Sequence, residues 1–411
     1  MGVMPPAKRG PLTEPRFSSY TRPMAIRLRI GLCLLGLLPL SCSSSSRGER
    51  SALASWPYAT VSVVSSLPAE LTGRPVFNGQ WIVADPDRGT VLAESSEPRY
   101  VLRLSVNDPH RVDFLDLGVG AGAENVIFAE RGRVALLIGS VGNRPAGISV
   151  DARAVLRFDL DQNLLLDTIP LGRNDLARGL ALDPQERRLF LLTDDGAGNG
   201  TMEVLDLYGG RILLRKPVGE IPVGMRRKGI ALDNNGHALY CLTGGESAHS
   251  DFPPVGETPR GPEMLILETD SLNVETRIPM TEGASPIALA FDSDRNRAIA
   301  LEVMGDKSQL LIVDAGFREI RDKVGFRSIA TDLVIRGGYA FLPGPDGITV
   351  VDLDRAQVAG TLYLHLDRTG EIAISPDGTR ALVLFQGGLP PGPPGIAVIA
   401  LDTGTIVDVL Q

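Results

Sequence analysis

Four stretches of the sequence repeat one pattern and decide the fold: Leu180-Ala181-Leu182-Asp183-Pro184, Ile230-Ala231-Leu232-Asp233-Asn234, Leu289-Ala290-Phe291-Asp292-Ser293 and Ile372-Ala373-Ile374-Ser375-Pro376. Each is an apolar strand that ends in a turn, and a second apolar strand follows each turn, at 189–193, 238–243, 298–303 and 381–385. Weaker copies begin at Ile82, Val126 and Leu333. The anchor positions 85, 129, 183, 233, 292, 336 and 375 lie 39 to 59 residues apart, which is the spacing of a repeat protein.

A second apolar element recurs in phase with the first, at 155–160, 202–207, 264–268, 310–314, 348–353 and 396–401, and another strand follows each copy. The unit is therefore strand, turn, strand, loop, strand, turn, strand. A small sheet of continuous apolar strands cannot cover both of its faces alone, whereas sheets stacked around an axis cover each other. The sequence predicts an all-β chain that forms a seven-bladed β-propeller of four-stranded antiparallel blades. The content of 46 Gly and 30 Pro agrees with many turns.

The ends of the propeller segment predict how the ring closes. The seventh unit is complete from 372 to 410, yet the β-rich stretch 59–64 precedes the first unit. We expect this stretch to pair with an edge of the first or last blade, because a bare edge strand invites aggregation.

The N-terminus predicts export. Arg27 and Arg29 precede an apolar run of 11 residues, Ile30–Leu40, which is too short to span a bilayer and suits a secretory signal. The sequence Leu38-Pro39-Leu40-Ser41-Cys42 resembles the lipobox of bacterial lipoproteins, although Pro39 stands where that family usually has Leu. The resemblance implies that the Cys42 sulfur is acylated. A plain cleaved signal peptide and a retained anchor helix are the alternatives.

These features divide the chain into four parts. We expect residues 1–23 to be an over-extended N-terminus or a dispensable tail, 24–41 the lipoprotein signal peptide, 42–54 a Ser-rich tether and 55–411 the propeller. Ser43-Ser44 after the Cys resembles outer-membrane lipoproteins, which places the expected protein in the bacterial cell envelope, facing the periplasm or the cell surface. Cys241 is expected to be an inert core thiol, since it stands alone in the mature chain outside Cys42.

One stretch carries a second resemblance. Val218-Gly219-Glu220-Ile221-Pro222 and Gly229–Tyr240 together resemble the YVTN-type repeats, also called YncE-like, of bacterial surface and exported propellers. Residues 223–228 interrupt the match. The resemblance covers about 55–411 and implies fold and compartment more than activity.

The charge balance excludes nucleic acid as a partner. Residues 1–41 hold six of the 41 basic residues and one of the 49 acidic ones, so the remainder carries a net charge of −13. A body this acidic repels phosphate backbones and anionic lipid.

The position that enters the first strand of each unit is expected to face the mouth of the central channel, and three of these positions hold Asn125, Asp332 and Glu371. Such oxygen ligands resemble the divalent-metal site of gluconolactonase-like propellers, which implies Ca²⁺ or a similar ion. A water-filled, hydrogen-bonded mouth is the alternative. No cofactor is firmly indicated.

Cationic residues gather in the loops that lead to the first strands, and we interpret these as a candidate ligand rim or a solvated mixed-charge rim: Arg178, Arg227, Lys228, Arg327 and Arg368. The long loops 194–200, 244–262 and 386–395 are expected on the same face, which we call the loop face.

The leading functional hypothesis is a non-catalytic, membrane-tethered propeller that binds an envelope protein, a glycan or a small ligand through the loop face. The alternative is a metal-dependent lactonase that uses Asn125, Asp332 and Glu371. The sequence leans away from an enzyme, because it offers no second cluster of metal ligands and the repeat signature is incomplete. It also contains no nucleophile elbow, P-loop or haem-attachment motif.

Overall fold

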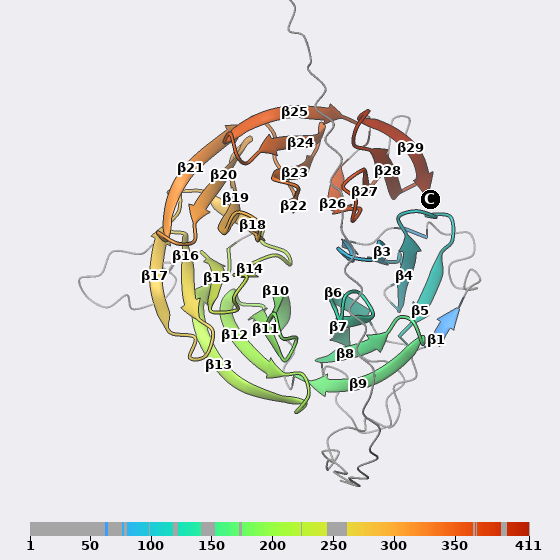
Figure 1. Cartoon of the computed structure of the whole chain (residues 1–411), viewed down its shortest axis with the longest axis horizontal. Coiled ribbons are helices and arrows are strands. Elements are labelled where there is room, and N and C mark those ends of the chain that lie inside the picture. The colour runs from blue at the N-terminus through green and yellow to red at the C-terminus, as the bar shows by residue number, and fades with distance from the viewer. Residues whose placement is uncertain are drawn as a thin grey trace, which may run out of the picture. The chain divides into compact units, whose positions relative to one another are not determined.

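The computed structural model describes residues 62–64, 76–77, 80–97, 99–117, 122–140, 153–171, 175–222, 224–244, 261–364, 366, 368–387 and 393–410. These residues form seven antiparallel sheets arranged in a ring (Figure 1). The predicted seven-bladed, all-β propeller is confirmed. Residues 1–61, which hold the predicted signal, lipidation site and tether, lie outside the described residues. Within the described ranges, no helix is long and apolar enough to cross a membrane.

Each blade begins with its innermost strand and ends with its outermost one. Blade 1 consists of β2 (Ile82–Ala84), β3 (Thr90–Glu94), β4 (Tyr100–Ser105) and β5 (Asp113–Asp116). Blade 2 consists of β6 (Gly122–Ala129), β7 (Val134–Ser140), β8 (Arg153–Asp159) and β9 (Leu164–Pro170). Blade 3 consists of β10 (Leu176–Leu182), β11 (Arg188–Asp194), β12 (Asn199–Asp206) and β13 (Arg211–Glu220).

The remaining blades follow the same order. Blade 4 consists of β14 (Ile230–Leu232), β15 (Ala238–Thr243), β16 (Glu263–Glu268) and β17 (Val274–Pro279). Blade 5 consists of β18 (Ser285–Asp292), β19 (Arg297–Met304), β20 (Lys307–Asp314) and β21 (Glu319–Phe326). Blade 6 consists of β22 (Val334–Arg336), β23 (Tyr339–Gly344), β24 (Gly347–Asp352) and β25 (Gln357–Tyr363). Blade 7 consists of β26 (Thr369–Ile374), β27 (Arg380–Phe385), β28 (Gly395–Ala400) and β29 (Thr405–Leu410).

The ring closes between two complete blades. The extra strand β1 (Ser62–Val64) pairs antiparallel with β5 and adds to the outer edge of blade 1, so the described part of the predicted stretch 59–64 takes one of the two expected arrangements. Blade 7 takes all four strands from the C-terminal segment. Arg380 Nη1 of blade 7 donates a hydrogen bond to Val106 O of blade 1 at 3.1 Å and so links the first and last blades.

The core lies between the blades, because each sheet is apolar on both faces. Buried apolar clusters fill all seven interfaces between neighbouring blades. At the first interface, Leu92 and Leu115 of blade 1 pack with Leu137 and Phe158 of blade 2, and all four side chains are buried. Burying one such side chain contributes about 1.5–3 kcal/mol, so the interfaces provide most of the stability and explain the continuous apolar strands.

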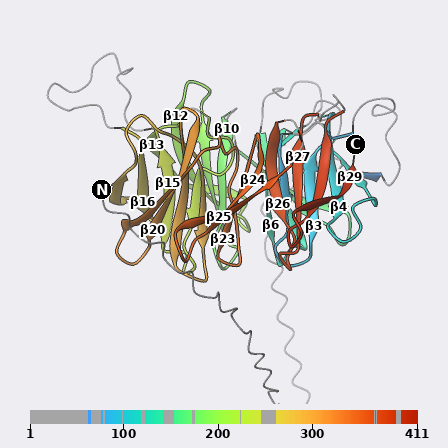
Figure 2. The ribbon, with the colours of Figure 1, turned by 90° about the horizontal axis from the view of Figure 1, so that it is seen from above.

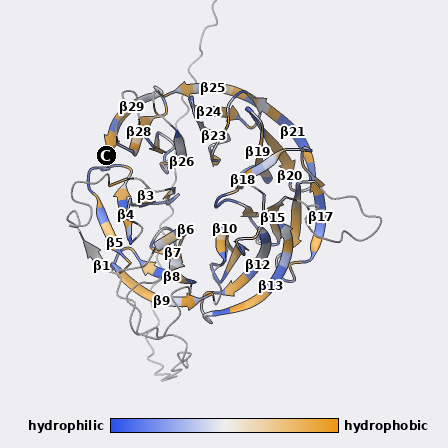
Figure 3. Cartoon of the chain, turned by 180° about the vertical axis from the view of Figure 1, so that it is seen from behind, coloured by the Kyte–Doolittle hydropathy of each residue, from blue (hydrophilic) through white to orange (hydrophobic). Residues whose placement is uncertain are grey.

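Among the outermost strands, β13 and β21 show the alternation that is expected of a strand with one side toward water. In β13, exposed and half-buried residues alternate along the whole strand. Figure 3 shows hydrophilic and hydrophobic segments along this strand.

The strands run between two faces of the ring, which Figure 2 shows from the side. The loops from second to third strand and the connections between blades lie on the loop face. The turns that join first to second and third to fourth strands lie on the opposite face, which we call the turn face. Aspartates close many of these turns; Asp183 Oδ1, for example, accepts hydrogen bonds from the backbone N of Arg187 and Arg188 at 2.6 and 2.9 Å.

Candidate functional site

Bulges in the innermost strands direct side chains toward the axis at the loop-face end. The register of β6 shifts between Ala123 and Asn125, and that of β10 shifts between Ala177 and Gly179. β18 has the same shift between Pro286 and Ala288. Because a bulge redirects the residue that follows it, the matched positions of different blades meet at the channel mouth.

The structure places the sequence-predicted residues Asn125, Asp332 and Glu371 at this mouth, where Asp332 and Glu371 make equivalent contacts with the next blade. Ile372 N donates to Asp332 Oδ2 at 3.1 Å, from blade 7 to blade 6. Ile82 N makes the equivalent bond to Glu371 Oε2 at 3.2 Å, from blade 1 to blade 7. Asn125 Oδ1 accepts a bond from the next backbone N, as Asp332 Oδ1 does. All three residues are buried.

A three-residue segment, Arg227–Gly229, occupies the mouth, and we call it the axial hub. It precedes β14 of blade 4 and forms hydrogen bonds with the six other blades. Arg227 donates to Gln80 O beside blade 1, to Glu124 O of blade 2 and to Glu371 of blade 7. Lys228 Nζ donates to Leu333 O beside blade 6 at 3.2 Å, and Lys228 O accepts from Leu289 N of blade 5 at 2.7 Å.

The last residue of the hub completes the set. Gly229 N donates to Arg178 O of blade 3 at 2.9 Å. A Cβ at Gly229 would lie 2.6 Å from Met225 Sδ and 2.8 Å from a Leu192 methyl carbon. A side chain at this position would therefore require the Met225 and Leu192 side chains to move.

Two ion pairs join the hub to the predicted carboxylates. Lys228 Nζ lies 2.7 Å from Asp332 Oδ1, and Arg227 Nη1 lies 2.9 Å from Glu371 Oε1. The side chains of Asp332 and Glu371 are 4% and 5% exposed. Each carboxylate therefore has a cation and a backbone N–H as partners, which is the arrangement that makes a buried charge tolerable.

Burial dominates the electrostatics of the mouth. It raises the pKa of Glu371, and the negative charge of Asp332 raises it further, whereas Arg227 and Lys228 act in the opposite direction. Burial also raises the pKa values of Glu94 and Glu124, and Arg227 partly offsets both shifts. Arg227 is thus the cation that three half-buried or buried carboxyl groups share.

The ion pairs of the hub involve the same carboxylates that the sequence predicts as metal ligands. Asn125, Asp332 and Glu371 come together, but the hub places two cations between them. Among the residues that the structure describes, no group of three or more His, Cys, Asp or Glu side chains could hold a metal ion. A divalent ion at the mouth would have to displace Arg227 or Lys228, so the metal site stays a prediction that the ion pairs do not favour.

The five rim cations have different environments. Arg227 and Lys228 belong to the hub, and Arg178 pairs with Asp194, with Nη2 2.7 Å from Oδ2. Arg327 and Arg368 are exposed on the loop face. The sequence predicts Arg227 and Lys228 on the rim, whereas both side chains lie at the channel mouth and bind its carboxylates. The interruption of the YVTN-like repeat at 223–228 is the one sequence feature that marks this segment as unusual.

An apolar cavity of about 350 Å³ lies along the axis beside the hub. Aliphatic side chains of the innermost strands form its walls, among them Val83, Ile127, Leu182 and Leu232. Asn125, Arg227, Lys228 and Glu371 supply its polar groups.

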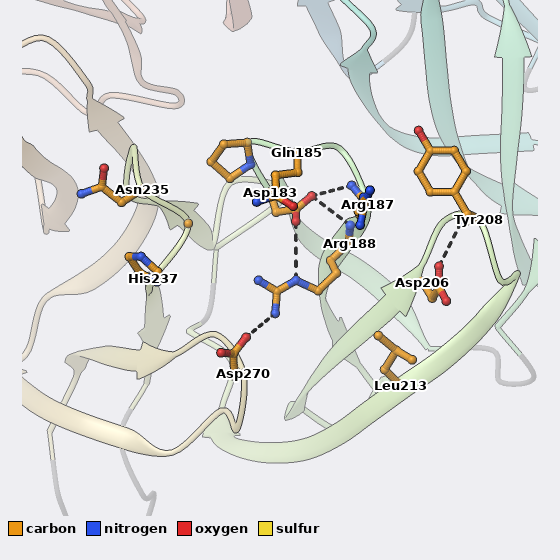
Figure 4. A pocket seen from close by; sticks show the side chains of 12 residues that line it. Asp183, Gln185, Arg187, Arg188, Asp206, Tyr208, Leu213, Asn235, His237 and Asp270 are labelled. Atoms are coloured by element: carbon orange, nitrogen blue, oxygen red, sulfur yellow. Dashed lines mark hydrogen bonds and ion pairs between the residues drawn. The ribbon is translucent and has the colours of Figure 1, made fainter.

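A larger cleft of about 710 Å³ lies on the turn face between blades 3 and 4. Figure 4 shows that Arg188 extends across it, between Asp183 of its own blade and Asp270 of blade 4. Tyr208 comes from the turn between the third and fourth strands of blade 3, Leu213 comes from the fourth strand, and Asn235 and His237 come from the first turn of blade 4. No sequence motif had indicated this cleft, because its residues belong to ordinary turns.

Comparisons with known proteins bear on the fold. No family model and no curated protein matches the sequence. Among solved structures, the chain is similar to hydrazine synthase of Kuenenia stuttgartiensis, with a TM-score of 0.56 and 12% identity over 80% of this chain and 96% of that one. It is also similar to dihydro-heme d1 dehydrogenase NirN in complex with DHE, with a TM-score of 0.51 and 14% identity over 82% of this chain and 66% of that one. At this level of identity the similarity establishes a shared propeller architecture alone.

Proposed function

We propose that this protein is an exported, lipid-anchored β-propeller that acts as a non-catalytic binding or scaffold protein through its loop face. The observation that carries the proposal is the pair of contacts between the axial hub and the channel mouth. Asp332 and Glu371 are the carboxylates that a metal-dependent hydrolase would use, and Lys228 and Arg227 of the same chain neutralise them at 2.7 and 2.9 Å. Carboxylates that are already paired with cations of the same chain hold the blades together and are not free to bind a catalytic metal ion.

The loop face supports a binding role because part of it is preorganised. In the loop 194–200, Asp194 Oδ1 accepts hydrogen bonds from Gly196 N and Gly198 N at 2.8 and 3.1 Å. Asp195 Oδ1 accepts bonds from Ala197 N and Asn199 N at 2.9 and 3.1 Å. A loop already fixed by internal bonds loses little conformational entropy when a ligand binds. The exposed Arg327 and Arg368 add cationic groups to the same face.

The predicted partners are therefore an envelope protein, a glycan or a small ligand. The membrane is reached only through the acyl chains on Cys42, and the acidic body has no affinity for nucleic acid. The bacterial cell envelope, on the outer membrane, is the proposed location.

Site-specific photo-crosslinking in cells tests the loop face. A photo-reactive residue at Ala197 or Arg368 is expected to yield discrete adducts, whereas one at Val407, 54% exposed on the outer strand β29, is the matched control. Adducts from Val407 equal to those from the loop face, or none from the loop face, would overturn the proposal.

Metal titration tests the alternative, a lactonase that uses Asn125, Asp332 and Glu371. We expect Ca²⁺ to leave the melting temperature of the wild type unchanged and simple lactones to remain intact. Lactone hydrolysis together with a Ca²⁺-dependent rise in melting temperature that Asp332→Asn abolishes would establish the enzyme instead.

A further inference from the structure

We propose that the cleft on the turn face between blades 3 and 4, continued to blade 5, binds an uncharged oligosaccharide. This site lies on the opposite face from the loop-face site proposed above and is independent of it.

The cleft is long enough for more than one sugar ring. The cavity of about 710 Å³ between blades 3 and 4 adjoins one of about 320 Å³ that reaches blade 5. Asn235, His237 and Asp270 line both cavities, so the two share one wall, formed by the turns of blade 4. Volumes of this size hold drug-sized ligands. The shape therefore favours a chain of rings over a single small molecule.

Ion pairs and a turn hydrogen bond connect the walls of the two cavities. Arg188 Nη1 lies 2.6 Å from Asp270 Oδ1 and ties blade 3 to blade 4 across the first cavity. Arg318 Nη2 lies 2.9 Å from Glu275 Oε2 and ties blade 5 to blade 4 across the second. The backbone N of His237 donates a hydrogen bond to Asp233 Oδ1 at 2.8 Å, which closes the turn that carries the His237 side chain. A rigid wall lowers the entropic cost of binding.

An exposed aromatic ring supplies the apolar contact that a sugar needs. Tyr208 is 67% exposed, yet the Arg157 guanidinium lies 5.7 Å from its ring centroid and restrains it. Leu213, 47% exposed, lines the same cavity. A pyranose ring has a face of C–H groups that packs on the electron-rich face of an aromatic ring. An aromatic side chain this exposed beside polar groups is what such stacking requires.

The polar groups of the cleft match hydroxyls rather than a charge. Gln185 and Asn235 offer both amide donors and acceptors, and His237 offers a ring nitrogen of either kind. Six carboxylates line the two cavities, and three guanidinium groups accompany them: Asp183, Asp206, Asp233, Glu268, Asp270 and Glu275, with Arg187, Arg188 and Arg318. This acidic excess disfavours phosphate, sulfate and uronate ligands and favours an uncharged polyol.

Calorimetric titration of the purified full-length protein tests the proposal with named probes: N-acetylglucosamine tetramer, cellotetraose and maltotetraose, with tetragalacturonate as the anionic comparison. At least one uncharged tetrasaccharide is expected to bind at micromolar to millimolar concentration. Tyr208→Ala is expected to weaken that binding at least tenfold, and Tyr208→Trp to retain it. Tyr363→Ala is the matched control, because Tyr363 is 75% exposed on blade 6 and should leave binding unchanged.

Three outcomes would overturn the inference. The first is that none of the uncharged tetrasaccharides binds at millimolar concentration. The second is that Tyr208→Ala binds as tightly as the wild type, with an unchanged melting temperature in both. The third is that tetragalacturonate binds more tightly than any uncharged probe. None of these results bears on the loop-face crosslinks, so the two proposals fail separately.

Discussion

Arg227 Nη1 donates a hydrogen bond to Glu371 Oε1 at 2.9 Å, although 144 positions separate the two residues in the chain. The bond joins the connection that leads into blade 4 to the innermost strand of blade 7, on the other side of the axis. A ring of blades is held by contacts between neighbours, so a contact across the centre adds a different kind of restraint. The axial hub thus couples blades that do not otherwise touch.

Removing the cation of this pair should destabilise the ring strongly. In Arg227→Ala, the carboxylate of Glu371 stays buried without its partner, and breaking a buried pair in this way costs about 3–5 kcal/mol. The variant also loses the bonds to Gln80 O and Glu124 O. Chemical denaturation should report this loss in the free energy of unfolding.

The double variant Arg227→Met/Glu371→Gln is the control, because it removes both charges and keeps similar volumes. It should be more stable than Arg227→Ala. If Arg227→Ala unfolds like the wild type, the hub is not a structural restraint.

The raised pKa of Glu371 gives the hub a pH dependence. Its carboxyl is surrounded by Asp332, Arg227 and Lys228, and burial is the largest cause of the shift upward from 4.5. The folded state therefore binds this proton more tightly than the unfolded state. The resulting stabilisation is complete below pH 4.5 and is lost as the pH rises through the folded-state value, at up to about 1.4 kcal/mol per pH unit.

Glu371→Gln removes the titrating carboxyl group and should therefore reduce the dependence of the unfolding free energy on pH above 4.5. The difference in unfolding free energy, wild type minus Glu371→Gln, is expected to fall as the pH rises above 4.5. The measurement is denaturant unfolding at a series of pH values. A difference that rises with pH would mean that the ion pair with Arg227 outweighs burial.

Much of this architecture follows from the sequence, for reasons that particular residues illustrate. Leu180–Leu182 and Ile230–Leu232 predict innermost strands because local apolar runs determine which residues the sheets bury. The same periodicity placed Asn125, Asp332 and Glu371 at the mouth, since the repeat carries one position per blade to the axis.

The hub and the turn-face cleft do not follow in this way. Arg227 and Lys228 lie in a non-repeating connection, and their partners Glu371 and Asp332 are 144 and 104 positions away. No local pattern encodes such a contact. The cleft depends on the spacing between separate blades, as in the contact of Arg188 with Asp270, 82 positions apart. The hub arises from contacts across the axis, and the cleft arises from the packing of neighbouring blades.

Cys241 should be chemically inert in the folded protein. The side chain is buried in β15, and burial raises the pKa of its thiol to about 12. Because the thiolate is the nucleophile, iodoacetamide at pH 8 should leave Cys241 unmodified in the native state and label it fully in denaturant. Peptide mass spectrometry locates the label and separates Cys241 from Cys33 and Cys42. Labelling of Cys241 in the native protein would show that blade 4 opens on the time scale of the reaction.

The proposed acylation of Cys42 predicts where the protein is found after cell fractionation. Several acyl chains on Cys42 would hold the protein on a membrane stably, whereas one chain would not. Cys42→Ala should therefore move the protein from the membrane fraction to the soluble exported fraction, as immunoblots of separated fractions would show. Cys33→Ala is the matched control, because it changes a cysteine inside the signal and should leave the protein on the membrane.

Salt separates this anchor from electrostatic attachment. The chain beyond residue 41 carries a net charge of −13, and like charges repel it from anionic lipid. High salt should therefore fail to release the wild type, while detergent should release it. Membrane association of Cys42→Ala that resists salt would assign the attachment to another residue or to a retained apolar segment at 30–40.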